Sequence, residues 1–294
     1  MSRYIDAQRA SFGVEPICRT LQVAPSSYYA AKLRPPSARA VRDQQLNTHI
    51  ARVHAANFGV YGVRKLWRGL LRDGVPVGRD RVARLMAALG LGGVTRTRSI
   101  RTTHPGALGE RPADLVQRSF NAPAPNRLWL ADLTYVWTIS GFCYTAFIVD
   151  AFSRAIVGWR VAATLRTDLA LDALEMAIWA RGAHLPGLVH HSDRGVQYLA
   201  IRYTERLADA GAVNSVGSKG DSYDNALAES VNGLYKAELI RRRRSWRTLE
   251  EVELATAEWV DWWNHRRLHS ACGNIPPVEF EAAYARRLEV TAAA

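Results

Sequence analysis

The chain has 294 residues, 48% of them hydrophobic, and nine of them are tryptophan. This length and this apolar content exclude a disordered chain and allow two or three domains, one of them with a substantial core. No apolar run reaches the roughly 18 residues of a membrane-spanning helix, and residues 1–30 lack a signal-peptide pattern, which predicts a cytoplasmic protein without a membrane partner. The three cysteines are scattered without a CxxC pair, which fits a reducing compartment.

Positive charge is concentrated in the first part of the chain. The net charge is +12; residues 1–120 contain 20 Lys and Arg against 7 Asp and Glu, whereas residues 121–294 contain 19 against 20. The first part therefore has the electrostatic footprint of a protein that binds a polyanion. A basic surface that is merely solvated explains the charge alone equally well.

Residues 1–36 predict a segment of short helices. One helix covers Val14–Leu21, and after a turn Ser26 or Ser27 can cap a second helix that continues to Leu33. The pair Pro35-Pro36 ends that helix, and a further helix is expected from about residue 38 to residue 54.

Residues 37–98 predict a helix-turn-helix DNA-binding region. A helix over Tyr61–Leu71 has its apolar residues on one face, and a second helix over Arg79–Leu89 is ended by Gly90. A short basic helix after a tight turn suits insertion into a major groove, although an ordinary helical hairpin with a solvated basic face is the alternative. The arginines that the second helix would present to DNA are Arg79, Arg81 and Arg84.

Residues 99–126 lose all periodicity and are predicted to be a linker, whose arginines either follow phosphates or belong to a plain tether. Residues 127–285 then predict an α/β fold with a mixed sheet and a C-terminal helix, and residues 286–294 a tail. The expected elements are strands over 129–138, 142–149, 156–162, 188–191 and 212–216, and helices over 168–181 (with Trp179 inward), 201–210, 224–240 and 248–264, the last begun by a Thr248–Glu251 capping pattern.

Three acids in this second part suggest a metal site. Asp132 interrupts an apolar strand, Asp193 follows a short buried strand, and Glu229 lies in a largely apolar helix. Singly, each has an ordinary explanation: a paired strand-end aspartate, a turn aspartate and a solvated glutamate. Together they offer the hard oxygen ligands that two magnesium ions need to cut and join phosphodiesters.

Other polar groups compete with this interpretation. Asp150 is expected to support the turn that follows it, and Asp224 to cap the glutamate helix. A zinc site at His265, His269 and Cys272 would have only three ligands, and we do not favour it. The run of Arg241, Arg242, Arg243 and Arg244 is expected to touch phosphates, with a solvated charge run as the alternative.

The combined motifs resemble the OrfB transposases of bacterial insertion sequences, which belong to the retroviral-integrase-like superfamily. The resemblance covers essentially the whole chain, and its departures are small: Asp221-Ser222-Tyr223 and Val231-Asn232 stand where many members have other residues. The residues that carry it are Trp129-x-x-Asp132, Asp150-x-Phe-Ser-Arg154-x-Ile-Val-Gly158-Trp159, His191-Ser192-Asp193-Arg194-Gly195-x-Gln197-Tyr198, Asp224-Asn225-Ala226-x-Ala228-Glu229-Ser230 and Trp263-Asn264-x-Arg266-Arg267-x-His269.

The resemblance implies an RNase H-like core with a mixed five-stranded sheet flanked by helices, in which Asp132, Asp193 and Glu229 are the catalytic triad and the metal ligands. It implies two Mg²⁺ ions per site, with Mn²⁺ as a substitute, and assigns Lys236 to a DNA contact near the transposon end. The implied partners are double-stranded DNA (inverted-repeat ends and target), further copies of the chain in a synaptic complex, and an upstream OrfA protein as partner or fusion. The implied location is the bacterial nucleoid.

Two other functions remain open from the sequence. The chain alone is either an active transposase or a DNA- or partner-binding regulator that needs its upstream partner to cut. A non-specific nuclease with the same core would leave the basic helix-turn-helix region unexplained.

Overall fold

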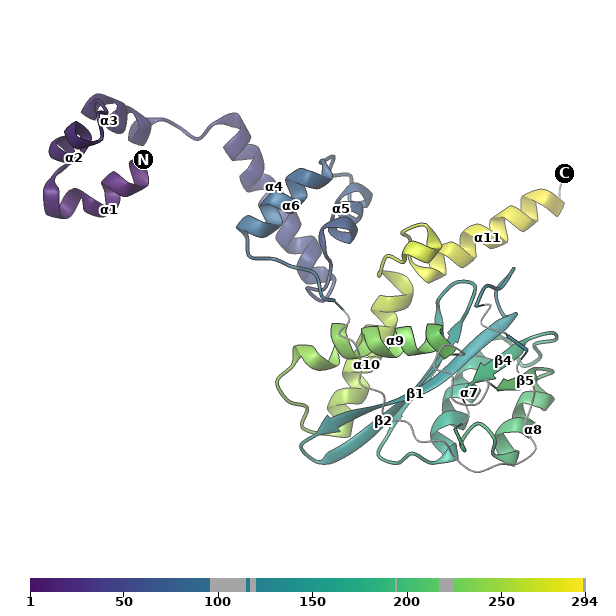
Figure 1. Ribbon diagram of the computed structural model, residues 1–294. Coiled ribbons are helices and arrows are strands. Elements are labelled where there is room, and N and C mark those ends of the chain that lie inside the picture. The colour runs from purple at the N-terminus through teal and green to yellow at the C-terminus, as the bar shows by residue number, and fades with distance from the viewer. Residues whose placement is uncertain (96–114, 117–119, 194, 217–224, 293–294) are drawn as a thin grey trace. The chain divides into compact units, whose positions relative to one another are not determined.

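The computed structural model describes residues 1–95, 115–116, 120–193, 195–216 and 225–292 (Figure 1). The chain forms two compact units, Met1–Ile50 and Ala51–Ala294. The aspartate expected to cap the glutamate helix, Asp224, lies outside the described residues. The domain limits expected from the sequence stay predictions.

The first unit consists of short helices around a small core. They are α1 (Ser2–Phe12), α2 (Val14–Thr20), α3 (Pro25–Leu33) and the first part of α4 (Ala38–Ala56). The predicted serine cap is wrong, because α3 begins at Pro25, with Ala24 as its N-cap. The fixed φ of proline suits the first helical position, where its missing N–H costs nothing.

The helical hairpin of the second unit forms as predicted. Helices α5 (Val63–Arg72) and α6 (Arg79–Ala88) bury apolar residues, and Gly90 adopts a positive φ of 67° just after α6. The Trp67 indole donates a hydrogen bond of 2.8 Å to the Val77 carbonyl, which fixes the turn between the two helices.

A mixed five-stranded sheet forms the centre of the second unit, which confirms the predicted fold class. The antiparallel strands β1 (Leu128–Thr138), β2 (Gly141–Asp150) and β3 (Ile156–Ala162) are followed by β4 (Val189–Ser192) and β5 (Val213–Val216). The order is β3-β2-β1-β4-β5, and β4 is parallel to both of its neighbours. All five strands lie within two residues of the predicted ranges.

Helices cover both faces of this sheet (Figure 1). One face packs against α7 (Thr167–Arg181) and α8 (Ile201–Asp209) through a single apolar cluster. On the other face, the Phe147 ring meets Tyr235 of α9 (Ala226–Glu238) and Trp259 of α10 (Leu249–His265), at centroid distances of 5.0 and 5.9 Å. The predicted cap of α10 is confirmed, because the Thr248 hydroxyl accepts a hydrogen bond from the Glu251 N–H.

One inward residue was predicted wrongly. Trp179 of α7 is 88% exposed, although its helical spacing placed it with the apolar residues of that helix. The buried stripe of α7 runs through alanines and Leu174 instead, because small side chains let the helix lie close to the sheet.

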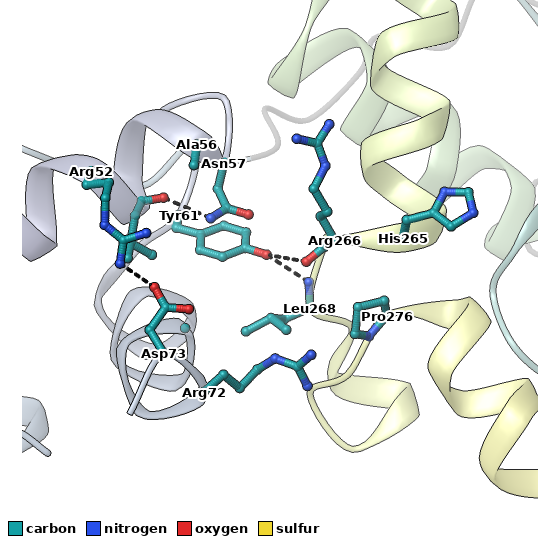
Figure 2. Close-up of a pocket in the computed structure, with 12 residues that line it drawn as sticks. Arg52, Ala56, Asn57, Tyr61, Arg72, Asp73, His265, Arg266, Leu268 and Pro276 are labelled. Carbon is teal, nitrogen blue, oxygen red and sulfur yellow. Dashed lines mark hydrogen bonds and ion pairs between the residues drawn. The ribbon is translucent and has the colours of Figure 1, made fainter. Parts of the chain in front are cut away.

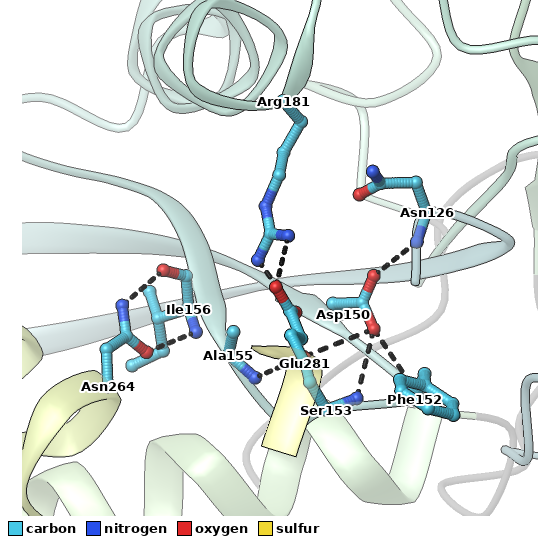
Figure 3. A network of polar contacts seen from close by, with 9 residues as sticks. All are labelled: Asn126, Asp150, Phe152, Ser153, Ala155, Ile156, Arg181, Asn264 and Glu281. Carbon is cyan, nitrogen blue, oxygen red and sulfur yellow. Dashed lines mark hydrogen bonds and ion pairs between the residues drawn. The ribbon is translucent and has the colours of Figure 1, made fainter. Parts of the chain in front are cut away.

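The turn after β2 is held by the Asp150 carboxylate, as predicted (Figure 3). It accepts hydrogen bonds from the backbone N–H groups of Asn126 at 2.7 Å, Phe152 at 2.9 Å and Ser153 at 3.1 Å. Beside it, the Asn264 side chain bonds both backbone groups of Ile156. The last helix, α11 (Pro277–Ala292), continues through most of the segment expected to be a tail.

Candidate active site

Strand alternation places Asp132 on the face of the sheet that α9 covers. Trp129 and Ala131 belong to the cluster under α7, whereas Leu128 and Leu130 pack with Ala228 of α9 on the other face. Because successive side chains of a strand point to opposite faces, Asp132 shares the face of Leu130. The carboxylate therefore lies under the helix that carries Glu229.

The pairing of β1 with β4 brings Asp193 beside Asp132. The two strands are parallel, and the last paired residues are Ala131 and Ser192. Asp132 and Asp193 directly follow this last pair, so the two carboxylates lie next to each other where the pairing of β1 with β4 ends. One Asp193 oxygen accepts a hydrogen bond of 2.9 Å from the Gly195 N–H, which ties the loop after β4 to this side chain.

The start of α9 is tied to the residue before Asp132. The Asn225 amide donates a hydrogen bond of 2.9 Å to the Ala131 carbonyl. Glu229 is exposed on the first turn of α9, and its charge acts on Asp132. Burial, Asp193 and Glu229 together raise the pKa of Asp132 to about 8. The structure thus brings the three predicted acids into electrostatic contact.

Asn232 is a site residue that sequence reasoning did not identify. Its side-chain amide donates a hydrogen bond of 2.8 Å to Asp132 Oδ2, while the Leu133 N–H donates one of 2.9 Å to Oδ1. The side-chain oxygen of Asn232 is buried and has no hydrogen-bond partner among the described residues. The available signal was its position three residues after Glu229, on the same side of the helix.

The carboxylates fit divalent ions in their chemistry. Among the residues described, no three Asp, Glu, His or Cys side chains already converge closely enough to hold an ion. Burial first, and then the charges of Asp193 and Glu229, raise the pKa of Asp132, and burial likewise raises the pKa of Asp193. Carboxylate oxygens are the ligands that hard divalent ions prefer, so the side chains present match such a group.

Comparison with known proteins agrees with this arrangement. Two integrase core domain families match residues 122–222 and 211–277, and an HTH-like domain family matches residues 41–99. The chain is 58% identical over 268 residues to a putative transposase for the insertion sequence element IS986/IS6110 of Mycobacterium tuberculosis, covering 90% of this chain and 96% of the relative. The chain belongs to the insertion-sequence transposases. It is also 52% identical over 292 residues to the transposase for IS629 of Shigella sonnei, covering 97% of this chain and 96% of the relative.

The family establishes the general activity. As a transposase with an integrase core, the protein is a DNA-cutting and DNA-joining polynucleotidyl transferase of the DDE type, and its core uses divalent metal. The transposase binds DNA and contains an HTH-like domain. None of the described helices combines the length and the apolar character that a bilayer crossing requires.

The predicted DNA-contacting residues of the transposase lie on two surfaces. Arg79 and Arg84 are exposed on α6, and Arg81 is half-buried there. Arg241–Arg244 are exposed after α9, around the short helix η2 (Ile240–Arg242). Lys236 is half-buried, with its Nζ 4.4 Å from the centre of the Tyr135 ring, and burial lowers its pKa. The structure therefore places Lys236 on the helix that carries Glu229, and the arginine run directly after that helix.

The three residues considered for zinc serve the backbone instead. His265 is exposed and its Nδ1 lies 3.1 Å from the Asp261 carboxylate. His269 is buried with Nε2 3.1 Å from the Trp263 carbonyl, and the Cys272 thiol donates to the Ser153 carbonyl at 3.1 Å. Burial lowers the pKa of His269, so its ring is neutral.

A pocket of about 240 Å³ has none of the three predicted catalytic acids among its lining residues (Figure 2). The Tyr61 hydroxyl at its wall accepts a hydrogen bond of 2.8 Å from the Leu268 N–H. Its arginines are engaged by acids: Arg52 pairs with Asp73 at 2.6 Å, and Arg72 with Glu279 at 2.6 Å. The residues that line this pocket come from the α4–α5 segment and from the chain after α10. We assign the pocket no catalytic role.

Proposed function

We propose that Asp132, Asp193 and Glu229 are the catalytic carboxylates of the transposase and hold two Mg²⁺ ions, with Mn²⁺ as a substitute. The observation that carries this proposal is the arrangement of β1, β4 and α9: the parallel register of β1 and β4 ends next to Asp132 and Asp193, and α9, which carries Glu229, contacts the Asp132 carboxylate through Asn232. Two of these carboxylates come from the sheet region and the third from α9. Divalent cations that bind between neighbouring carboxylates stabilise their charged forms, because the cations offset the repulsion between the negative charges.

The reaction follows from positioning. Bound Mg²⁺ supplies charge neutralisation at the phosphate and lowers the pKa of the attacking hydroxyl. Water first replaces the 3′ oxygen at phosphorus and frees a 3′-OH at the element's end. That 3′-OH then replaces the bridging oxygen of a second phosphodiester, in line and without a covalent protein–DNA intermediate. The chain contributes the rigid placement of the acids by β1, β4 and α9, which is the main source of rate acceleration in such sites.

The DNA contacts follow from the two basic surfaces. Arg79, Arg81 and Arg84 of α6 read or hold the inverted-repeat ends, and Lys236 holds the strand near the cut. The run Arg241–Arg244 binds phosphates of the same duplex or of target DNA. Joining two ends requires at least two copies of the chain. An upstream OrfA partner or fusion, and a place in the nucleoid, are proposed from the family resemblance.

The test is an Asp132→Asn variant assayed with inverted-repeat DNA and Mg²⁺. Because the amide cannot replace a carboxylate ligand, we expect cleavage and strand transfer to fall below detection, with DNA binding within about twofold of wild type. Asp150→Asn is the matched control, since Asp150 supports a turn: it should lower stability and keep measurable cleavage.

Loss of DNA binding equal to the loss of cleavage in Asp132→Asn would contradict the assigned role. If wild-type protein binds ends but cuts only after the upstream partner is added, the chain alone is a binding regulator, and the triad assignment is then tested in the reconstituted pair.

A further inference from the structure

The β1–β2 hairpin of the second unit carries an exposed aromatic face. Tyr135, Trp137 and Phe142, called here the hairpin platform, are 47%, 64% and 49% exposed. Trp137 and Phe142 are cross-strand partners, and their rings meet edge to face at a centroid distance of 4.6 Å. Phe142 meets Tyr135 in the same way at 5.7 Å. The three rings thus form one continuous and ordered surface.

The platform is the uncovered end of an otherwise packed sheet face. Its β1 residues alternate with buried ones and continue the row of Trp129 and Ala131, which lies under α7. Leu133 is the last residue of this row that still packs against the core there. Three large aromatic side chains in water on one surface of a soluble protein mark a binding site.

Positive charge lies beside the platform. Lys236 Nζ lies over the Tyr135 ring at 4.4 Å. The hairpin turn is joined to the chain just after the arginine run, since Ile139 N–H donates to the Trp246 carbonyl at 2.8 Å and Ser140 N–H to the Arg247 carbonyl at 3.2 Å. Trp246 is buried, and its indole donates to the Ile240 carbonyl at 3.0 Å. The arginine run is therefore anchored to the hairpin that presents the rings.

We propose that the hairpin platform binds unpaired DNA bases by stacking, while Lys236 and Arg241–Arg244 hold the phosphates of the same strand. Aromatic rings beside a basic track are the surface that single strands select, because every base has a face that stacks and every nucleotide carries a charge. Tyr135 follows Asp132 by three residues, about 10 Å along β1. The Tyr135 ring and the Asp132 carboxylate point to opposite faces of β1, and Lys236 connects them, because its Nζ lies over the Tyr135 ring and its charge interacts with Asp132. A strand on the platform is therefore within a few nucleotides of the cut, and the inference depends on the proposed active site only for this location.

A second copy of the chain is a poorer occupant. A two-fold interface through this surface would bring Lys236 and the arginine run of one copy against the same charges of the other, which is unfavourable. Among the described residues near the run, Glu251 already pairs with Arg243 at 2.8 Å. A polyanion with flat apolar rings pairs its negative charges with Lys236 and the arginine run, and its rings cover the exposed aromatic side chains.

The experiment compares Trp137→Ala with Trp179→Ala in the full chain, with a short fluorescent single-stranded oligonucleotide as the probe and no divalent ion present. Trp179 is the matched control, because it is an exposed tryptophan on α7, away from the hairpin. We expect Trp137→Ala to weaken binding of the single strand by roughly 5- to 100-fold, and Trp137→Phe to retain most of it. Trp179→Ala should bind as wild type does.

Two further readouts separate stacking from charge. The salt dependence of binding should keep its slope in Trp137→Ala and lose slope in Arg244→Ala, because only the arginine releases counterions. A bromouracil-substituted strand photocrosslinked to wild-type protein should mark peptides with Tyr135, Trp137 or Phe142, which needs no variant to fold.

Equal single-strand affinity of wild type and Trp137→Ala, or crosslinks confined to other peptides, would overturn the proposal. A change in oligomeric state with unchanged single-strand affinity would reassign the platform to a protein interface. Single-strand binding is measured without divalent ion, so a negative result in this experiment does not affect the assignment of the three acids. A negative result in the Asp132→Asn test likewise does not affect the measurement of single-strand binding.

Discussion

At the scale of single residues, the most informative contact is the amide of Asn232 on the Asp132 carboxylate. A carboxylate that binds metal needs a fixed rotamer, and Asn232 supplies one restraint from α9 while the Leu133 N–H supplies another. This side-chain hydrogen bond of 2.8 Å joins the strand that bears one acid to the helix that bears another.

We predict that Asn232→Ala lowers both Mg²⁺ affinity and the cleavage rate by about 10- to 100-fold, because partners of metal ligands have effects of this size. The Mg²⁺ concentration for half-maximal cleavage, and isothermal titration with Mg²⁺, measure the effect. Ser230→Ala on the same helix is the control, since the Ser230 hydroxyl bonds the Ala226 carbonyl of its own helix. Wild-type Mg²⁺ affinity in Asn232→Ala would show that Asp132 is oriented without this contact.

A second residue-scale prediction concerns pH. His190 is fully buried in β4, with Nε2 3.0 Å from the Tyr203 hydroxyl, and burial lowers its pKa from 6.5 to about 3. Below pH 6.5 the unfolded chain binds a proton there that the folded chain does not, so stability is lost as pH falls. The expected contribution is about 2 kcal/mol at pH 5.

Urea unfolding of wild type and His190→Gln at pH 7.5 and at pH 5 measures this effect. The variant should be less stable at pH 7.5 and should lose less stability on acidification than wild type. His265→Gln, whose ring is exposed, should follow the wild-type pH dependence. Parallel pH profiles for wild type and His190→Gln would mean that His190 does not carry the loss.

The sequence predicts the three acids as candidates, but not the residues that contact Asp132 and the start of α9. Asp132, Asp193 and Glu229 differ from their surroundings in charge, which a linear pattern shows directly. Asn232 and Asn225 contact residues that lie 100 and 94 positions earlier in the sequence. These contacts depend on how α9 is rotated over β1. Helical spacing predicts which residues face the core only to within one position. For this reason Trp179, which is exposed, was predicted to face inward.

At the scale of secondary-structure elements, β3 and α7 lie very close together at Gly158. A side chain built on Gly158 would overlap the Ala173 carbonyl oxygen and lie 2.9 Å from the Ala177 Cβ. Gly158 and the alanines of α7 thus set how near the helix lies to the sheet, and they explain the glycine in the motif after Asp150.

We therefore predict that Gly158→Ala lowers the free energy of unfolding by about 1–3 kcal/mol or more, because backbone atoms of α7 must move. Thermal unfolding measures the change. Gly78→Ala is the control: a Cβ there meets nothing within 4 Å, and the φ of −76° is open to alanine. Equal melting temperatures for Gly158→Ala and wild type would show that α7 has room to shift.

Element types were predictable where a strong pattern exists, and boundaries less so. Alternation and apolar runs indicated all five strands, and the Thr248 cap indicated where α10 begins. The start of α3 was missed, because two serines looked like better caps than the Ala24–Pro25 pair. Proline at the first helical position and serine at the cap are competing signals, and local sequence does not rank them.

At the scale of the whole molecule, charge is divided along the chain. Residues 1–120 carry the excess of Lys and Arg, while residues 121–294 are nearly balanced, with 19 basic against 20 acidic residues. Duplex DNA should therefore be held mainly by the basic part, and the catalytic part should add local contacts only.

This division predicts a salt effect. Arg79→Ala should weaken duplex binding at every sequence tested and reduce the slope of log affinity against log salt by about 1. Arg202→Ala is the control, because Arg202 is an exposed arginine of α8 that pairs with Asp168 at 3.0 Å, as Arg79 pairs with Asp80 at 3.2 Å. The assay is fluorescence anisotropy over a range of salt concentrations. An unchanged slope in Arg79→Ala would place the duplex elsewhere.

The alternation of β1 has a consequence for how such elements decay in genomes. Deleting one codon between Trp129 and Asp132 preserves the reading frame, yet it puts both side chains on one face of the sheet, so that either the carboxylate turns toward α7 or Trp129 moves to the other side. An in-frame loss of three nucleotides there would thus silence mobility as completely as a stop codon. Dead copies that still encode a full-length chain are expected to carry such lesions in β1 more often than in the exposed surface of α11.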